Sequence, residues 1–247
     1  FFVSLIYFYK LILNKNKSQI LAIIGVLFLF FSPRIFAQSF FNPKDVGFMS
    51  MCIINIYYGI KYLKKKDLSS AIIFSIVSGM SVGFRILGLF IPLIIIFIAW
   101  IDKLRNFKDL QKNYSLIALI LTLPFFIILF WPYLWSDPLN NFTNAYKILS
   151  NHYRPINNLF MGQYISALYV PWYYILVWIA ITTPILYLLL FIVGIYFSTK
   201  RIANRLLKIE DGTYKDLWRG NNEKIDLIYI LIIILPVLTV IIFHSSL

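Results

Sequence analysis

Phosphate-binding and metal-binding residue types lie close together in the segment from Ser32 to Asp45. Arg34 and Lys44 are cations, Asn42 carries an amide, and Asp45 is a carboxylate. Cations bind phosphate oxygens, and carboxylate and amide oxygens are ligands for hard divalent cations. The segment therefore predicts a site for a phosphate group and for a divalent metal ion held by Asp45. The alternative is that the cations anchor the chain at a membrane surface and that Asp45 caps a helix.

Three further residues could take part in such a site. Arg85 lies in an apolar run between Gly83 and Gly88. An arginine in hydrocarbon is unfavourable, so we expect it to face a polar cavity, where it would suit a lipid-linked phosphate, or to snorkel to the interface. His152 could contact a phosphate or a metal, but its position in a loop favours a solvated histidine over such a contact. Asp137 precedes a proline, which favours a helix cap over a catalytic group.

The composition limits the class of protein that can position these residues. Of 247 residues, 60% are apolar and 13% are charged, whereas soluble domains are about 45–50% apolar and about 25% charged. We therefore expect an all-α bundle of transmembrane helices. The net charge of +13 does not indicate nucleic-acid binding in so apolar a chain. The single cysteine, Cys52, lies in an apolar run, which excludes disulfides and cysteine-based metal sites.

About eight apolar runs are predicted to cross the membrane, and the first of them is partial. A helix needs about 20 apolar residues to cross a bilayer, so residues 1–13 are expected to end a helix that starts upstream. The run at 69–101 is too long for one helix and is expected to form two short helices that turn near Arg85. The other predicted spans are residues 18–33, 46–63, 115–132, 173–198 and 227–243.

The distribution of cations predicts the orientation of these spans. Eighteen of the 23 Lys and Arg lie in four segments, which the positive-inside rule places in the cytoplasm. Only two acidic residues, Asp45 and Asp137, then lie on the outer side, together with His152 and His244. A site on the outer face therefore has few candidate residues. The four cation-rich segments are residues 10–17, 61–66, 103–112 and 200–224.

Two loops complete the single membrane domain predicted for residues 1–247. Residues 131–173 are predicted to form an outer-face loop with a short amphipathic helix on the membrane surface, because apolar residues recur there at helical spacing. Residues 199–226 are predicted to form a basic cytoplasmic loop that could bind anionic lipid head groups. The apolar positions of the amphipathic helix are Leu139, Phe142, Tyr146 and Leu149.

Several motifs within residues 18–198 resemble a known group of membrane enzymes. The chain is similar to the GT-C superfamily of bacterial membrane glycosyltransferases, in the branch of protein O-mannosyltransferases and lipid A aminoarabinose transferases. The motifs are Ser32-Pro-Arg-Ile-Phe-Ala with Asn42-Pro-Lys-Asp45, Gly83-Phe-Arg-Ile-Leu-Gly88, Trp131-Pro-Tyr-Leu-Trp135 with Asp137-Pro138, and Pro171-Trp-Tyr with Ile181-Thr-Thr-Pro184.

The resemblance implies that a sugar is transferred, with inversion, from a polyprenyl-phosphate donor to a glycan, lipid or protein acceptor. The reaction would occur at the outer face of the bacterial inner membrane. The general base of this family is a carboxylate in the first outer loop, which would lie upstream of residue 1. Asp45 matches a second family position, at the start of a later helix, near the donor phosphate or a metal ion.

Two other classes of membrane protein remain open. A transporter or lipid flippase would show internal repeats and ionisable residues in paired, broken helices at mid-membrane. The sequence shows no convincing repeat, and its outer carboxylates lie in loops. A structural or assembly subunit would use the aromatic outer loop as a docking surface.

Overall fold

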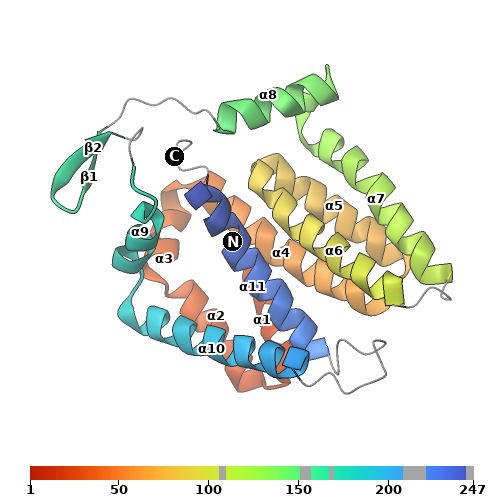
Figure 1. Cartoon of the computed structure of the whole chain (residues 1–247), viewed down its shortest axis with the longest axis horizontal. Coiled ribbons are helices and arrows are strands. Elements are labelled where there is room, and N and C mark those ends of the chain that lie inside the picture. Colours follow the sequence, from red (N-terminus) through yellow and green to blue (C-terminus); the bar gives the residue numbers. More distant parts are fainter. Residues whose placement is uncertain (106–109, 151–156, 167–169, 208–220, 243–247) are drawn as a thin grey trace.

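The computed structural model describes residues 1–105, 110–150, 157–166, 170–207 and 221–242. These ranges are helical apart from connecting segments and one β-hairpin, so the all-α prediction is confirmed in its main feature (Figure 1). The elements are α1 (Phe2–Asn16), α2 (Gln19–Phe30), α3 (Pro33–Phe41), α4 (Pro43–Lys65), α5 (Leu68–Phe84), η1 (Ile86–Leu89), α6 (Phe90–Arg105), α7 (Leu110–Phe130), η2 (Pro132–Leu134), α8 (Pro138–Ser150), β1 (Asn157–Phe160), β2 (Gln163–Ser166), α9 (Tyr174–Thr182), α10 (Ile185–Leu207) and α11 (Asn221–Ile242).

The prediction of about eight spans is not supported. Among the described residues, two helices are long and apolar enough to cross a membrane, namely α4 and the Ile185–Asn204 part of α10. The pair α2 and α3, bent by 57°, would make a third if it counts as one span. Each predicted apolar run does contain a helix, but several of these helices are too short to count. The short apolar helices are Leu68–Phe84, Ile86–Asp102 and Tyr114–Phe130.

Two prolines explain why long apolar runs form shorter helices. Ser32 and Thr183 each precede a proline and have ψ angles of 116° and 129°, outside the helical region. The proline ring clashes with a helical conformation of the residue before it. As a result, the predicted span 18–33 ends early and the chain bends into α3, which occupies much of the segment from Ser32 to Asp45. The predicted span 173–198 likewise divides into α9 and α10.

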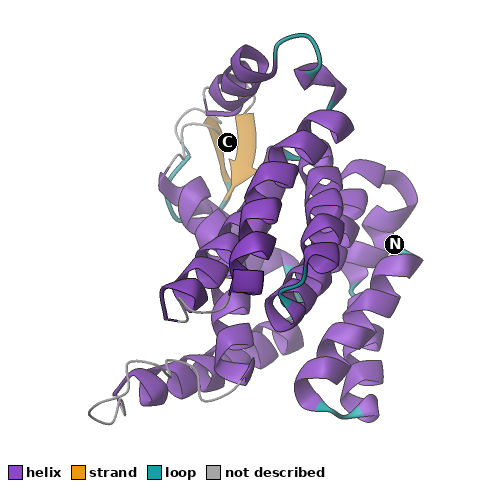
Figure 2. Ribbon diagram, turned by 90° about the vertical axis from the view of Figure 1, so that its right-hand side faces the viewer, coloured by secondary structure: helices purple, strands orange, loops and turns teal. Residues whose placement is uncertain are grey.

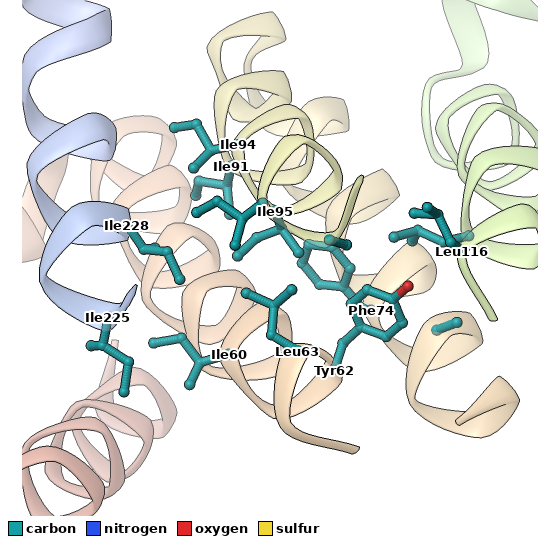
Figure 3. Close-up of a cluster of buried hydrophobic side chains, with 14 of the residues drawn as sticks. Ile60, Tyr62, Leu63, Phe74, Ile91, Ile94, Ile95, Leu116, Ile225 and Ile228 are labelled. Carbon is teal, nitrogen blue, oxygen red and sulfur yellow. The ribbon is translucent and has the colours of Figure 1, made fainter. Parts of the chain in front are cut away.

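The core lies between α4, α5, α6, α7 and α11, with a contribution from α1. The rings of Tyr62 on α4 and Phe74 on α5 stack with their centroids 6.1 Å apart. Ile95 of α6 and Ile228 of α11 are fully or almost fully buried in the same cluster (Figure 3). These side chains come from helices far apart in the sequence, so packing between helices and not local contacts defines the bundle.

Close packing of α5 against α7 depends on two glycines. A Cβ atom at Gly79 would lie 2.6 Å from the carbonyl oxygen of Phe126, and one at Gly83 would lie 2.6 Å from that of Phe130. Small residues four positions apart let helix backbones approach closely, as in membrane helix pairs. One turn before Gly79, the hydroxyl groups of Ser75 and Thr122 form a 2.8 Å hydrogen bond across the same interface.

Ion pairs gather at the end of the bundle where α1, α4, α6 and α10 finish and α11 begins. Asp226 of α11 is fully buried and binds one cation from α1 and one from α10. Asp102 of α6 binds one lysine beside the end of α4 and one at the start of α11. Segments that the cation distribution assigned to one side therefore meet in space. The pairs are Lys15–Asp226, Arg201–Asp226, Lys66–Asp102 and Lys224–Asp102.

The two predicted loops contain more regular structure than expected. In residues 131–173 the predicted surface helix is present as α8, which turns away from the direction of α7 (Figure 1). The antiparallel hairpin β1–β2 was not predicted (Figure 2). Its two-residue turn, Met161 and Gly162, has φ angles of 49° and 81°, the positive values that tight hairpins require. In residues 199–226, α10 continues to Leu207 and α11 starts at Asn221.

Candidate functional site

Asp45 and Arg85, two of the candidate residues from the sequence, form an ion pair at the end of the bundle opposite the ion pairs of Asp102 and Asp226. Asp45 lies in the first turn of α4, and Arg85 is the extended residue between α5 and η1. Nη2 of Arg85 donates to Oδ1 of Asp45. About half of the Asp45 side chain and 39% of the Arg85 side chain are exposed. The pair is therefore accessible, although the Nε of Arg85 is buried and finds no acceptor among the described residues.

Asn42 holds the second oxygen of Asp45. Its amide nitrogen donates to Oδ2 of Asp45 at 2.9 Å and to Oε1 of Gln38 at 2.7 Å. Its side-chain oxygen accepts the backbone amide of Asp45 at 3.1 Å, which makes Asn42 the N-cap of α4. The residue that caps α4 is therefore Asn42, and the alternative prediction that Asp45 caps this helix is wrong. Both carboxylate oxygens of Asp45 already accept hydrogen bonds, which fixes the orientation of the group.

The donor set around Asp45 does not suit a divalent cation. Within the described part of the chain, no group of three or more His, Cys, Asp or Glu side chains is close enough to share a metal ion. The guanidinium of Arg85 occupies the position beside Asp45 that a cation would take, and like charges repel. A metal contact at Asp45 stays a prediction, and no chemical step below is assigned to a metal.

Arg34 lies apart from this cluster. It is at the start of α3, whereas Asn42 follows the end of that helix. Its Nη1 donates to the hydroxyl of Thr182 at 2.7 Å, and that hydroxyl donates to the carbonyl of Trp178. Lys44 is exposed beside Asp45, with no ion pair to any described acidic residue. The structure therefore brings together Asp45, Asn42 and Arg85, but it joins Arg34 to the junction of α9 and α10.

A cavity of about 480 Å³ lies beside Arg34, between α2, α3, α9 and α10. Most of its lining is apolar, and its polar members come from the two proline breaks. The hydroxyl of Tyr187 is held by the carbonyl of Phe28 at 2.8 Å. The arrangement suits an amphipathic ligand with a long apolar part and an anionic head. The polar lining residues are Ser32, Arg34, Thr182, Thr183 and Tyr187.

Sequence reasoning nominated only Arg34 among these polar residues. Thr182 and Thr183 lie in a motif that resembles the GT-C family but predicts no role for them, and Tyr187 lies in the predicted span 173–198. The signal that could have indicated them was the proline at position 184, because a broken helix exposes backbone and side-chain polar groups at its break. The same reasoning applies to Ser32, which precedes Pro33.

The two weaker candidates have different outcomes. Asp137 caps α8, since Oδ1 accepts the backbone amide of Asn140 at 3.2 Å and Oδ2 accepts its side-chain amide at 2.6 Å. The hydrogen bonds from Asn140 hold the pKa of the Asp137 carboxyl below its usual range. This geometry supports the structural role over the catalytic one. His152 lies outside the described residues.

Comparison with protein-family models, with curated proteins and with solved structures gave no match. The resemblance to GT-C glycosyltransferases therefore depends on the motifs in the sequence alone.

Proposed function

We propose that this chain is part of a multi-pass membrane glycosyltransferase of GT-C type, which takes its sugar from a polyprenyl-phosphate donor. The observation that carries the proposal is the apolar cavity with the Arg34 guanidinium and two threonine hydroxyls in its wall. A polyprenyl phosphate has the same division into a long apolar chain and an anionic head. The isoprenoid chain would enter the cavity, and the phosphate would contact Arg34.

Arg34 is suited to bind this phosphate because its described partner is neutral. A guanidinium hydrogen-bonded to a hydroxyl keeps its positive charge uncompensated, and Arg binds phosphate through two parallel hydrogen bonds. Such charge-assisted hydrogen bonds contribute about 1.5–3 kcal/mol each. Thr182 would orient the guanidinium, so Thr182 is a positioning residue and Arg34 a binding residue.

The proposed reaction places the sugar between Arg34 and the cluster of Asp45, Asn42 and Arg85. The acceptor hydroxyl oxygen forms a bond to the anomeric carbon, and the bond from that carbon to the phosphate oxygen breaks. Polyprenyl phosphate leaves with the electron pair, and cations near it stabilise the developing charge. The hydroxyl proton goes to a base, which in the family that the chain resembles is a carboxylate of an outer loop. Asp45 and Arg85 would hold hydroxyl groups of the sugar or of the acceptor.

The location is part of the proposal. The cavity and the Asp45 cluster lie at the end of the bundle opposite the ion pairs of Asp102 and Asp226. Because those pairs use cations of the segments that the positive-inside rule assigns to the cytoplasm, we propose that the cavity and the cluster face outward. For a bacterial protein this is the periplasmic or extracellular face of the inner membrane. The acceptor would be a glycan, a lipid or a protein that reaches that face.

The test uses the full-length protein in proteoliposomes with a radiolabelled polyprenyl-phosphate sugar. We expect label on an added acceptor, and a roughly 10- to 100-fold higher KM for the donor in Arg34→Gln, as the loss of one charge-assisted contact predicts. Lys65→Gln, an exposed cation at the other end of the bundle, is the matched control and should leave the KM unchanged. Asp45→Asn should reduce transfer and leave donor binding intact.

The same assay separates the alternative, a transporter or lipid flippase. A flippase would move the labelled donor from one leaflet to the other without transferring the sugar. That result would refute the proposed function, and so would donor binding that is equal in the wild type and Arg34→Gln.

A further inference from the structure

A second, smaller cavity lies at the opposite end of the bundle, between α1, α4 and α11. Its volume is about 100 Å³. Three of its lining residues are apolar, and the others are two lysines, an asparagine and two tyrosines. The proposed sugar transfer uses none of these groups. The lining residues are Leu11, Asn14, Tyr57, Ile60, Lys61, Lys64, Ile225 and Tyr229.

The two lysines lie on one face of α4 together with a tyrosine. Tyr57, Lys61 and Lys64 follow each other at spacings of four and three residues, which places them on the same side of a helix. The ammonium of Lys61 lies 5.5 Å from the ring centre of Tyr58. Tyrosine and lysine in this order, at the end of a long apolar helix, are typical of the level of lipid head groups.

Neighbouring acids do not compensate the charge of these lysines. Asp102 and Asp226, the buried acids at this end, are each held by two other cations. Asp67 caps α5 through the amide of Ser70. Among the described residues no ion pair joins Lys61 or Lys64 to any carboxylate, including Glu223 at the start of α11. The cavity lining therefore combines two lysines that have no ion pair with a described carboxylate and three apolar side chains.

We propose that this cavity binds the phosphodiester group of an anionic phospholipid. Lys61 and Lys64 would bind the phosphate oxygens, with the Asn14 amide as a further donor. Leu11, Ile60 and Ile225 would contact the glycerol and the first acyl carbons. A free phosphate ion shares the anionic chemistry but has nothing to place against these apolar side chains. The inference is independent of the proposed sugar transfer.

The test measures lipid binding to the purified chain in detergent micelles, by equilibrium retention of labelled phosphatidylglycerol or of phosphatidylcholine with the same acyl chains. We expect phosphatidylglycerol to bind more tightly. The double variant Lys61→Gln/Lys64→Gln should weaken this binding about 30-fold, since each cation near a lipid surface contributes about fivefold. The matched control Lys17→Gln/Lys65→Gln removes two exposed lysines from the same end and should change it less than about threefold.

Two further measurements decide the outcome. Lys61→Arg/Lys64→Arg keeps the charges and should retain binding, which separates the loss of charge from any loss of fold. Millimolar inorganic phosphate should not compete with the lipid. Equal losses in the two glutamine variants, equal affinity for the two lipids, or full competition by inorganic phosphate would each overturn the proposal.

Discussion

Replacing the buried carboxylate of Asp226 tests the arrangement of the cation-rich end of the bundle. Its side chain is 0% exposed and joins three helices, because it binds Lys15 of α1 and Arg201 of α10 from its own position on α11. Arg201 donates to Oδ2 of Asp226 through both Nη2, at 2.7 Å, and Nε, at 2.8 Å, whereas Lys15 donates to Oδ1. Asp226→Asn removes the negative charge and leaves Lys15 and Arg201 without a negatively charged partner in this pair of contacts.

The expected loss of stability follows from the exposure of each partner. Breaking a buried ion pair costs about 3–5 kcal/mol, because a charge remains buried and uncompensated. The side chains of Lys15 and Arg201 are 20% and 50% exposed, so both cations can recover part of their hydration. We therefore expect Asp226→Asn to lower the free energy of unfolding by about 2–3 kcal/mol. Asp45→Asn breaks an exposed pair and should cost about 1 kcal/mol or less.

The assay is unfolding of the purified chain in mixed detergent micelles, followed by circular dichroism and by tryptophan fluorescence. Asp45→Asn is the matched control, since it makes the same chemical change at the other Asp–Arg pair. Adding Lys15→Gln to Asp226→Asn should restore part of the stability, because one uncompensated charge is removed. If Asp226→Asn unfolds within about 0.5 kcal/mol of the wild type, Asp226 does not hold α1, α10 and α11 together.

Two further predictions concern packing and orientation. Gly79→Ala should lower the free energy of unfolding by about 1–3 kcal/mol, because its Cβ would lie 2.6 Å from a backbone carbonyl oxygen. Gly194→Ala is the control in the same unfolding assay. A Cβ at Gly194 meets nothing within 4 Å, so this change should be neutral or stabilising. In a Cys52→Ala background, a membrane-impermeant maleimide added to right-side-out vesicles should label Leu139→Cys and leave Lys65→Cys unlabelled. Labelling of both positions from one side would contradict the orientation, and equal effects of the two alanines would contradict the close packing of α5 and α7.

The sequence predicts the helices of this chain well because its signals are local. Apolar runs and the cation-rich segments between them act over a few positions. The division of those runs was harder to predict. Pro33 and Pro184 bend or end a helix, whereas Pro124 and Pro236 lie inside α7 and α11. The outcome depends on whether tertiary contacts favour the break, which single-residue preference does not specify.

The candidate site was predictable from the sequence only where the distribution of charged residues between the two sides of the membrane was enough to identify its members. Placing most cations on one side left a small outer group, chiefly Arg34, Lys44, Asp45 and Arg85, and two of these, Asp45 and Arg85, form an ion pair. The contact of Arg34 with Thr182 joins residues 148 positions apart in the chain. No local pattern encodes such a contact. The burial of Asp226 could not be predicted either, because in the sequence it is one of several acidic residues in a basic region.

The pairing of charges decides which predicted cation is available to a ligand. Arg85 is the more conspicuous residue in the sequence, since it interrupts an apolar run, but Asp45 offsets its charge in the folded chain. Arg34 looks like an ordinary interface anchor, yet it contacts only a neutral hydroxyl among its described partners and lines the larger cavity. Attraction for an anion depends on the net charge of the group and its partners. An incoming phosphate should therefore contact Arg34 first, and Arg85 would act on it only if the carboxylate of Asp45 moved away.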